Sequence, residues 1–389
     1  MRLERAALVI MFFAVPLISN AQTAAPAPTD PGSRALFAQK AGHNSEVIGL
    51  YREALRLNPA WTEGWWDLGR LLYQARRLAE AREALRKVVL LEPRHVASWI
   101  VLGLCDYDLS DYEDALEHLQ HARSFANFPN AQLQFAADYT TGLLLIHYGQ
   151  FEAAGLVLFP LGGQAAHDES YHQQMQRSGV SMPDLVAALG LVVLRLKILP
   201  REIPQGQHAM IAEAGWAGML MGQGEAAKAR AAFRELETQY PKQPNVHYAV
   251  GICLEESEPE AARAEFQKEL DISPGHVPAM LNIAVIDHAR GNDASAASFA
   301  GRAVSLAPES YPARALYGRV LLELGQLKEA IRELEAAVRF VPEAKESHYA
   351  LFRAYAADGQ KANAARAMAE FQRLVKLDAS ATPAPESPK

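Results

Sequence analysis

Cysteine is scarce in this chain. Cys105 and Cys253 are the only two among 389 residues, so a disulfide framework cannot hold the fold together. Aromatic residues make up only 8% of the chain, but half of all residues are hydrophobic. That apolar content is sufficient for a large buried core, and we expect both cysteines to be inert thiols inside it.

Catalytic motifs are also missing. The chain has no GxSxG turn for a nucleophilic serine, no HExxH zinc motif and no GxxxxGK phosphate loop. The segment Gly222-Gln223-Gly224 lacks the third glycine of a dinucleotide site. A nucleophile, a base and oxyanion donors cannot be assembled into a set, so the sequence predicts no enzyme and no cofactor. A hydrolase at the loop between His167 and His172 is the enzymatic alternative.

Two groups of polar residues have part of the pattern of a metal site. An acidic stretch has the oxygen spacing of a calcium loop, but Asp111 stands where that loop requires glycine. The histidine pairs lack the third ligand of a zinc site. We therefore expect no metal, and we interpret these side chains as solvated surface. They are Asp106, Asp108, Ser110, Asp114, Glu117, His118, His121, His167 and His172.

Positive charge is not in excess. The chain has 38 Lys and Arg against 45 Asp and Glu, a formal net charge of −7. A protein that binds the phosphate backbone of a nucleic acid usually carries a basic patch or a basic overall balance. We therefore expect no nucleic-acid partner.

Apolar runs long enough to cross a membrane are absent. The run at 6–18 follows Arg2 and Arg5 and is about 13 residues long, whereas a membrane-spanning helix needs about 20. Small residues end it at Ala21, which predicts a signal peptide at 1–21 and an exported protein, periplasmic or secreted. Retention of this segment as an uncleaved anchor is the alternative. Residues 22–33 and 379–389, rich in Ala and Pro, are expected to be disordered.

A period of about 34 residues dominates the rest of the chain. Prolines recur at steps of 33 or 34 residues in the C-terminal half, and one such pair lies near the N-terminus. A fixed period of this size predicts an array of repeats in which each unit packs only on its neighbours. The prolines are Pro59 and Pro93, then Pro241, Pro274, Pro308 and Pro342.

The unit at 62–95 shows the repeated pattern most clearly. Apolar residues recur at helical spacing through 65–72 and again through 81–91, which predicts two amphipathic helices. Gly69 lies inside the first helix, where glycine costs about 1 kcal/mol relative to alanine, and we attribute it to close packing between the two helices. The spacing resembles that of the tetratricopeptide repeat family. The residues that carry this resemblance are Trp65, Leu68, Gly69, Leu72, Ala81, Leu85, Val88 and Pro93.

The resemblance implies an all-α fold. It would be an α-solenoid of helix-turn-helix repeats, winding as a right-handed superhelix and interrupted near its middle. We expect an N-terminal array of about four repeats at 34–168, with a second helix that is lost near Pro160 in the last of them. An irregular joint at 169–209, with an apolar helix at 182–199, would precede a C-terminal array of five repeats at 210–378.

In this family the first helix of each unit lines a concave groove. The groove positions here are rich in the tyrosine, tryptophan and arginine typical of interface hot spots. The resemblance implies a non-enzymatic scaffold that binds a protein or an extended peptide. Trp66, Arg70 and Tyr73 would anchor one ligand, and Tyr349 with Arg353 a second. The candidate groove residues are Trp66, Arg70, Tyr73, Tyr107, Asp108, Tyr139, His147, Tyr248, Glu255, His288, Arg319, Tyr349 and Arg353, with Glu256 and Glu323 beside them.

Two further points bear on the partner. Family members that grip a C-terminal carboxylate use a Lys/Asn/Lys/Arg set, but the corresponding positions here are Trp66, Arg70, Ile100 and Leu104. That clamp is absent. The alternative function is a homo-oligomeric accessory factor in envelope assembly or secretion that self-associates through the apolar segment at 185–199. Trp65, Trp99 and Trp216 are expected to be packing residues.

Overall fold

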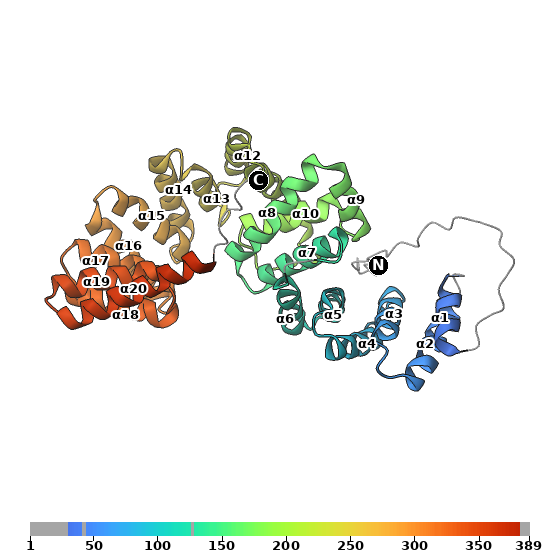
Figure 1. Cartoon of the computed structure of the whole chain (residues 1–389). Coiled ribbons are helices and arrows are strands. Elements are labelled where there is room, and N and C mark those ends of the chain that lie inside the picture. The colour runs from blue at the N-terminus through green and yellow to red at the C-terminus, as the bar shows by residue number, and fades with distance from the viewer. Residues whose placement is uncertain (1–29, 41–43, 126–127, 382–389) are drawn as a thin grey trace, which may run out of the picture. The chain divides into compact units, whose positions relative to one another are not determined.

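The computed structural model describes residues 30–40, 44–125 and 128–381. Within these ranges the chain forms α-helices and short 3-10 turns and no strands (Figure 1), so the all-α prediction is confirmed. The expected signal peptide at 1–21 lies outside the described residues. Residue packing divides the chain into an N-terminal unit that ends at Ala232 and a C-terminal unit that begins at Phe233.

The N-terminal unit is a row of helix pairs. Each helix of a pair packs on the other, and neighbouring pairs pack side by side. The helices are α1 (Pro31–Lys40), α2 (Asn44–Leu57), α3 (Thr62–Gln74), α4 (Leu78–Leu91), α5 (Val96–Leu109), α6 (Tyr112–Arg123), α7 (Ala131–His147), α8 (Phe151–His167), α9 (Glu169–Arg177), α10 (Met182–Val193) and α11 (His208–Gly222). The 3-10 turns η1 (Pro200–Glu202) and η2 (Gln205–Gln207) precede α11, and α12 (Ala226–Gln239) contains the boundary between the units.

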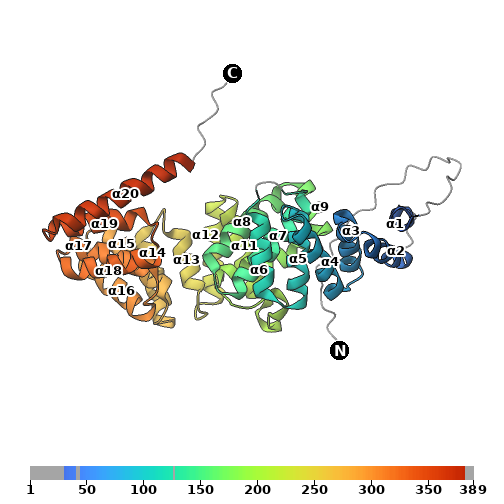
Figure 2. The ribbon, with the colours of Figure 1, turned by 60° about the horizontal axis from the view of Figure 1, so that its bottom comes forward.

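The C-terminal unit continues the pattern. Its first helices α15, α17 and α19 pack in sequence, and Figure 2 shows them on one side of the row with α16 and α18 on the other. Its helices are α13 (Val246–Leu254), α14 (Pro259–Ile272), α15 (Val277–Ala289), α16 (Asp293–Leu306), α17 (Tyr311–Glu323), α18 (Leu327–Phe340), α19 (Lys345–Ala357) and α20 (Lys361–Ala381).

Close helix packing explains the glycine found in several of the first helices. A Cβ atom at Gly103 would lie 2.7 Å from Cγ of Leu119, and one at Gly318 would lie 2.6 Å from Cγ of Leu334. Real carbon atoms do not approach this closely, so only glycine lets the two backbones come together. Gly69 faces Leu85 in the same way, which confirms the reason inferred for it from the sequence.

A second recurring contact joins five of the first helices to the turn before them. The side chain six residues after the repeat proline donates a hydrogen bond to that proline's carbonyl oxygen. Proline itself has no N–H, but its carbonyl still needs a donor, and this contact provides one. The donors are Trp65 Nε1 to Pro59 (2.9 Å), Trp99 Nε1 to Pro93 (2.8 Å), His247 Nε2 to Pro241 (3.0 Å), Arg314 Nε to Pro308 (2.6 Å) and His348 Nε2 to Pro342 (2.8 Å).

The segment at 169–209 differs from the irregular joint that we expected. It contains α9 and α10, and α10 packs on α8 and α11 within the N-terminal unit. A Cβ atom at Gly190 would overlap the carbonyl of Ile211, and one at Gly215 would overlap that of Val186. Most apolar side chains between Leu185 and Leu194 are buried, whereas Leu196 and Ile198 after the helix are half-buried. The self-association considered above stays a prediction.

The apolar helix α10 also ends earlier than predicted. Arg195 takes a left-handed conformation, with φ of 51°. Its N–H donates to the carbonyl of Val192 and the next N–H, of Leu196, donates to Leu191. These two bonds close the helix in a Schellman arrangement that usually carries glycine. The Arg195 side chain is held by Glu152 at 2.6 Å and by the ring of Phe151.

Three other helix ends differ from expectation. Helix α8 continues through Pro160, which lies on its exposed side together with Leu156, where water can take up the carbonyl that proline leaves without a donor. Helix α1 starts at Pro31, inside the expected lead-in, because Asp30 caps it by accepting from the N–H of Ser33 at 2.9 Å. Helix α20 extends to Ala381. No helix within the described residues combines the length and apolar character that membrane crossing requires.

Candidate functional site

The predicted groove tyrosines of the N-terminal unit are buried. Tyr73 is 2% exposed, and its hydroxyl donates to Oδ2 of Asp108 at 3.3 Å. Tyr139 donates to the carbonyl of Asp184 at 3.4 Å, and Tyr107 packs on the ring of Tyr112. Burial raises the pKa of all three phenols. As a correction to the expectation above, Tyr73, Tyr107 and Tyr139 are packing residues that a ligand cannot reach in this structure.

The other groove candidates of this unit are partly buried. Trp66 lies with its ring 5.1 Å from that of His95, and Arg70 contacts Asp67 at 3.3 Å. His147 packs its ring 4.7 Å from Tyr112. Burial raises the pKa of Asp108, although its ion pair with Arg76 at 2.6 Å acts in the opposite direction. These side chains are used mainly in contacts within the unit.

The stretch with calcium-like spacing is part ion-pair network and part solvated face, because Ser110, Asp114 and Glu117 are exposed. Asp106 is fully buried and contacts His118 at 2.8 Å and Arg82 at 3.4 Å. Arg82 also pairs with Asp111. Asp106 and Asp108 therefore have protein partners, and Asp106 corrects the interpretation of its own side chain as surface.

Of the three tryptophans that were expected to be packing residues, two make packing contacts and one is exposed. Trp65 and Trp99 each donate to a proline carbonyl, and Trp99 also lies against His121, with ring centroids 4.5 Å apart. Trp216 differs from the expectation, because it is 50% exposed on α11. The cysteines differ in the same way: Cys105 is buried and Cys253 only half-buried.

In the C-terminal unit, two candidates near its start are half-buried. The ring of Tyr248 lies 4.7 Å from that of His276 and 5.7 Å from that of Phe266. Burial raises the pKa of Glu255. Both side chains stay close to the protein, with only part of their surface open to a ligand.

The remaining candidates come together around one pocket. His288 of α15, Arg319 of α17, and Tyr349 and Arg353 of α19 line a cavity of about 490 Å³. That volume lies within the usual range of ligand pockets, about 300–1,000 Å³. The other lining residues are Leu322, Glu323, Lys345, Glu346, Ala350, Phe371 and Val375.

One wall of the pocket is aromatic and apolar. Tyr349 is 44% exposed, and its ring lies 5.3 Å from that of Phe371 and 6.0 Å from that of Phe352. Val375 extends this wall along α20. Exposed aromatic surface next to an apolar side chain is typical of a surface that accepts an apolar group of a partner.

The rest of the pocket is charged. Arg353 pairs with Glu323 at 2.9 Å, and Lys345 pairs with Asp378 at 2.6 Å. His288 contacts Asp293 at 2.6 Å. Arg319 is exposed and has no hydrogen-bond or ion-pair partner in the part of the chain that the structure describes. A guanidinium without a partner beside an apolar wall can accept a carboxylate or carbonyl group of a ligand.

Sequence reasoning missed the residues that α20 contributes. Phe371 and Val375 belong to a second helix, whereas the groove pattern considers first helices only. A signal for them exists: they lie four residues apart on α20, so they share one face of that helix.

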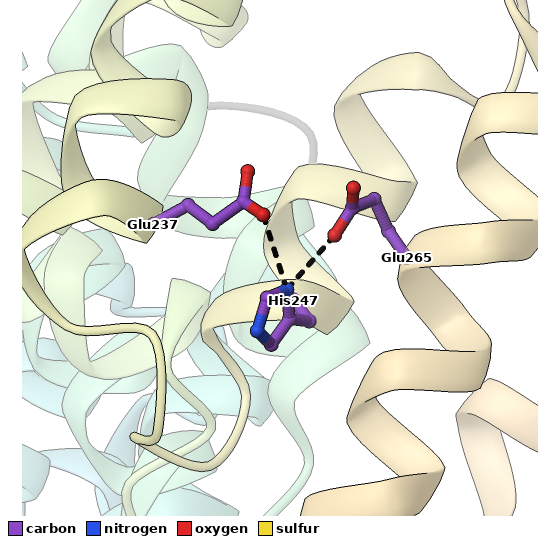
Figure 3. A group of neighbouring side chains, drawn as sticks. All are labelled: Glu237, His247 and Glu265. Atoms are coloured by element: carbon purple, nitrogen blue, oxygen red, sulfur yellow. Dashed lines mark hydrogen bonds and ion pairs between the residues drawn. The ribbon is translucent and has the colours of Figure 1, made fainter.

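A group able to hold a metal was also missed. Glu237, His247 and Glu265 bring one oxygen or nitrogen each to within 4.8 Å of one another in the C-terminal unit (Figure 3). No short motif marks them, because they come from three different helices, α12, α13 and α14.

Comparison with known proteins gives matches to repeat families. One tetratricopeptide repeat family model matches residues 34–89, 66–132 and 219–277, and another matches 288–354. A stretch of 105 residues is 31% identical to human N-alpha-acetyltransferase 16, NatA auxiliary subunit. It covers 27% of this chain and 12% of that protein, so the chain spans about an eighth of its relative's length.

Solved structures are similar at lower identity. MamA from Desulfovibrio magneticus RS-1, residue 41 to its end, is 21% identical over 44% of this chain and 96% of its own, with a TM-score of 0.40. YrrB, described as a TPR protein with an unusual peptide-binding site, is 19% identical over 42% of this chain and 86% of its own, with a TM-score of 0.39.

Proposed function

Because this chain belongs to the tetratricopeptide repeat family, whose helix pairs serve as protein-interaction scaffolds, we propose that it binds a protein or an extended peptide on the first-helix face of its C-terminal unit. The binding site is the pocket lined by Arg319, Tyr349 and Arg353. The protein acts as a non-enzymatic scaffold in this proposal.

The observation that supports it is the convergence of predicted groove residues. His288, Arg319, Tyr349 and Arg353 lie on three successive first helices, and all four line the same cavity. Side chains that are selected for packing between neighbouring repeats would be buried, as Tyr73 and Tyr139 are. Arg319, Tyr349 and Arg353 are instead exposed.

The residues that line the pocket indicate which kind of ligand it can bind. An apolar side chain fits the wall formed by Tyr349, Phe371 and Val375, while a carboxylate or a peptide carbonyl fits Arg319. Glu346, an exposed carboxylate among the lining residues, favours a basic group next to that apolar side chain. The expected ligand is a segment with one large apolar residue between groups of opposite charge.

Paired variants test this proposal. Arg319→Ala with Tyr349→Ala removes the guanidinium without a partner and the exposed ring. Arg339→Ala with Phe340→Ala removes the same residue types from exposed positions on α18 outside the pocket. Crosslinking capture from the envelope fraction of the source cell should lose a partner in the first pair and keep it in the second. Equal capture by both pairs would overturn the assignment of the pocket.

Export is the second part of the proposal. The apolar run at 6–18 between Arg5 and Ala21 supports a cleaved signal peptide. Mass spectrometry of the protein from fractionated source cells should find a mature chain that starts at Gln22, outside the cytoplasm. A cytoplasmic protein that keeps Met1 would contradict export, and an intact chain in the membrane fraction would favour the uncleaved anchor.

A further inference from the structure

Three consecutive helices of the C-terminal unit direct polar side chains at one point. Figure 3 shows Glu237 and Glu265 reaching toward the ring of His247 from either side. Nδ1 of His247 lies 2.8 Å from Oε2 of Glu265 and 3.6 Å from Oε1 of Glu237. The histidine is only 5% exposed, so its ring is held by the surrounding helices and cannot turn freely toward water.

The other nitrogen of the ring is fixed by the backbone. Nε2 of His247 lies 3.0 Å from the carbonyl oxygen of Pro241, a contact that only an N–H can make. Nε2 therefore carries hydrogen, and Nδ1 is the atom that faces the two carboxylates. Metal-binding histidines are typically oriented in this way, with the second ring nitrogen donating to a carbonyl or carboxylate.

The same position in another repeat shows what is special here. His348 donates from Nε2 to Pro342 at 2.8 Å, as His247 does to Pro241. Among the described residues, only His247 is joined by two carboxylates within metal-binding distance. The proline contact alone explains the orientation of the histidine, but it does not explain the paired glutamates.

The two carboxylates of the group are neutralised by cations that a metal ion could replace. Lys268 contacts Oε1 of Glu237 at 2.9 Å and Oε1 of Glu265 at 2.8 Å. Its side chain is 48% exposed, so it can move toward solvent. The remaining positive charge comes from a proton on Nδ1 of His247, which the hydrogen bond to Oε2 of Glu265 at 2.8 Å requires. Two carboxylates are thus balanced by one mobile ammonium and one exchangeable proton.

We propose that Glu237, His247 and Glu265 form a binding site for a divalent transition metal of the zinc class. One imidazole nitrogen and two carboxylate oxygens suit Zn²⁺, whereas Mg²⁺ and Ca²⁺ favour sites made of oxygen alone. Zinc bonds of about 2.0–2.1 Å place tetrahedral ligand atoms about 3.3 Å apart. The separations of Nδ1 of His247 from the two carboxylate oxygens, 2.8 Å and 3.6 Å, lie on either side of that value. All three ligand atoms lie within 4.8 Å of one another, so side-chain shifts would bring them to zinc-binding positions.

Binding would proceed by exchange of cations. Zn²⁺ takes the place of the Nδ1 proton of His247, which passes to solvent, and Lys268 moves away from the carboxylates. Water completes the coordination. Because the ligands belong to α12, α13 and α14, the metal would tie these helices together and stabilise the C-terminal unit.

Calorimetric titration of the full chain with Zn²⁺, after chelator treatment and at pH 7.5, tests the proposal. Glu265→Gln keeps the size of the side chain but removes a ligand charge, and it should weaken zinc binding at least about tenfold. His348→Gln is the matched control, because it removes a histidine from the same repeat position without touching the group, and it should leave the affinity unchanged.

Lys268→Met distinguishes a metal site from an ion-pair network. Loss of the competing ammonium should tighten zinc binding about tenfold, whereas a purely structural network would only lose stability. Lowering the pH to 5.5 should weaken binding because the proton competes for His247. The proposal is overturned if the wild-type chain binds no zinc. It is equally overturned if Glu265→Gln and His348→Gln bind zinc alike, since that would show adventitious binding at surface histidines. Circular dichroism of each variant checks that it is folded.

Discussion

At the scale of single residues, the fold depends on where a side chain is absent. Gly103 and Gly318 stand at the crossing points of their helix pairs, and a methyl group at either would come within 2.7 Å of a leucine Cγ on the partner helix. Helix propensity would favour alanine at both positions by about 1 kcal/mol. The close packing of the pair must therefore be worth more than that preference.

Gly103→Ala should lower the free energy of unfolding by about 1–3 kcal/mol, because overpacking of Leu119 outweighs the better helix propensity. Gly49 provides the matched control, since it lies in a helix of the same unit and a Cβ there would meet nothing within 4 Å. Gly49→Ala should raise stability by up to about 1 kcal/mol. Urea denaturation followed by circular dichroism measures both, and a stabilising Gly103→Ala would disprove the close-packing explanation.

At the scale of helices and turns, the turn that joins the two helices of a repeat has a left-handed residue, and its type differs between repeats. Gly291, Gly325 and Gly359 have φ between 73° and 76° in three C-terminal turns. The equivalent turn before α6 has Ser110, with φ of 70°. A left-handed conformation costs a residue with a Cβ about 1–2 kcal/mol, so this turn stores strain that glycine would avoid.

Ser110→Gly should therefore raise the free energy of unfolding, by about 1 kcal/mol after the greater flexibility of glycine in the unfolded chain is counted. The reverse exchange, Gly325→Ser, should lower it by a similar amount. Thermal unfolding of both variants measures the pair. Changes of the same sign in the two variants would contradict an effect of backbone conformation.

The cluster of His247, Glu265 and Lys268 predicts a pH dependence for the helices that it joins. Hydrogen bonding to Glu265 raises the pKa of His247 above 6.5, with burial opposing, so its stabilisation is complete below about pH 6.5 and is lost as pH rises through the folded-state pKa. Burial acts to raise the pKa of Glu265, but hydrogen bonds from His247 and Lys268 lower it overall. Its stabilisation is present above about pH 4.5 and is lost as pH falls through the folded-state pKa.

With a chelator present, the unfolding temperature should therefore decrease as the pH rises above about 6.5 and also as it drops below about 4.5. Glu265→Gln should remove the acid decline that belongs to this carboxylate and weaken the alkaline decline, since His247 then loses its charged partner. His348→Gln is the matched control, because it removes a histidine from the same repeat position and leaves the cluster intact. A profile for Glu265→Gln that matches the wild type would show that the cluster contributes nothing to stability.

At the scale of the whole molecule, the repeat array limits how far along the chain a substitution affects stability. Each helix pair packs on its neighbours in sequence, and the chain divides into two units at residues 232 and 233. Stability of such an array is approximately a sum of unit and neighbour contributions. Sites in different units should therefore respond independently.

Gly103→Ala and Gly318→Ala test this independence, because they make the same change in different units. The double variant should lose the sum of the two single losses to within about 0.5 kcal/mol. Denaturation curves of the four proteins provide the comparison. A larger deviation would show coupling between the units.

The sequence predicted the repeat fold well, because its period results from short-range packing. Gly103, the repeat prolines and the paired amphipathic patterns are local features, and the helices follow them. The exposure of Tyr73 and Tyr139 could not be predicted, because it depends on which neighbouring helix covers each ring. The contribution of Phe371 to the pocket and the meeting of Glu237 with Glu265 likewise depend on distances between helices, which a linear pattern does not contain.

The bond between a repeat proline and the side chain six residues later has a consequence for how such arrays acquire new sites. Tryptophan at this position, as in Trp65 or Trp99, donates its one side-chain N–H to the proline carbonyl and has no other polar atom. Histidine makes the same bond with Nε2, and its second ring nitrogen, Nδ1, can bind another group. A repeat with histidine at this position can therefore become part of a ligand site through substitutions on adjacent helices alone. Its hydrogen bond to the proline carbonyl is kept.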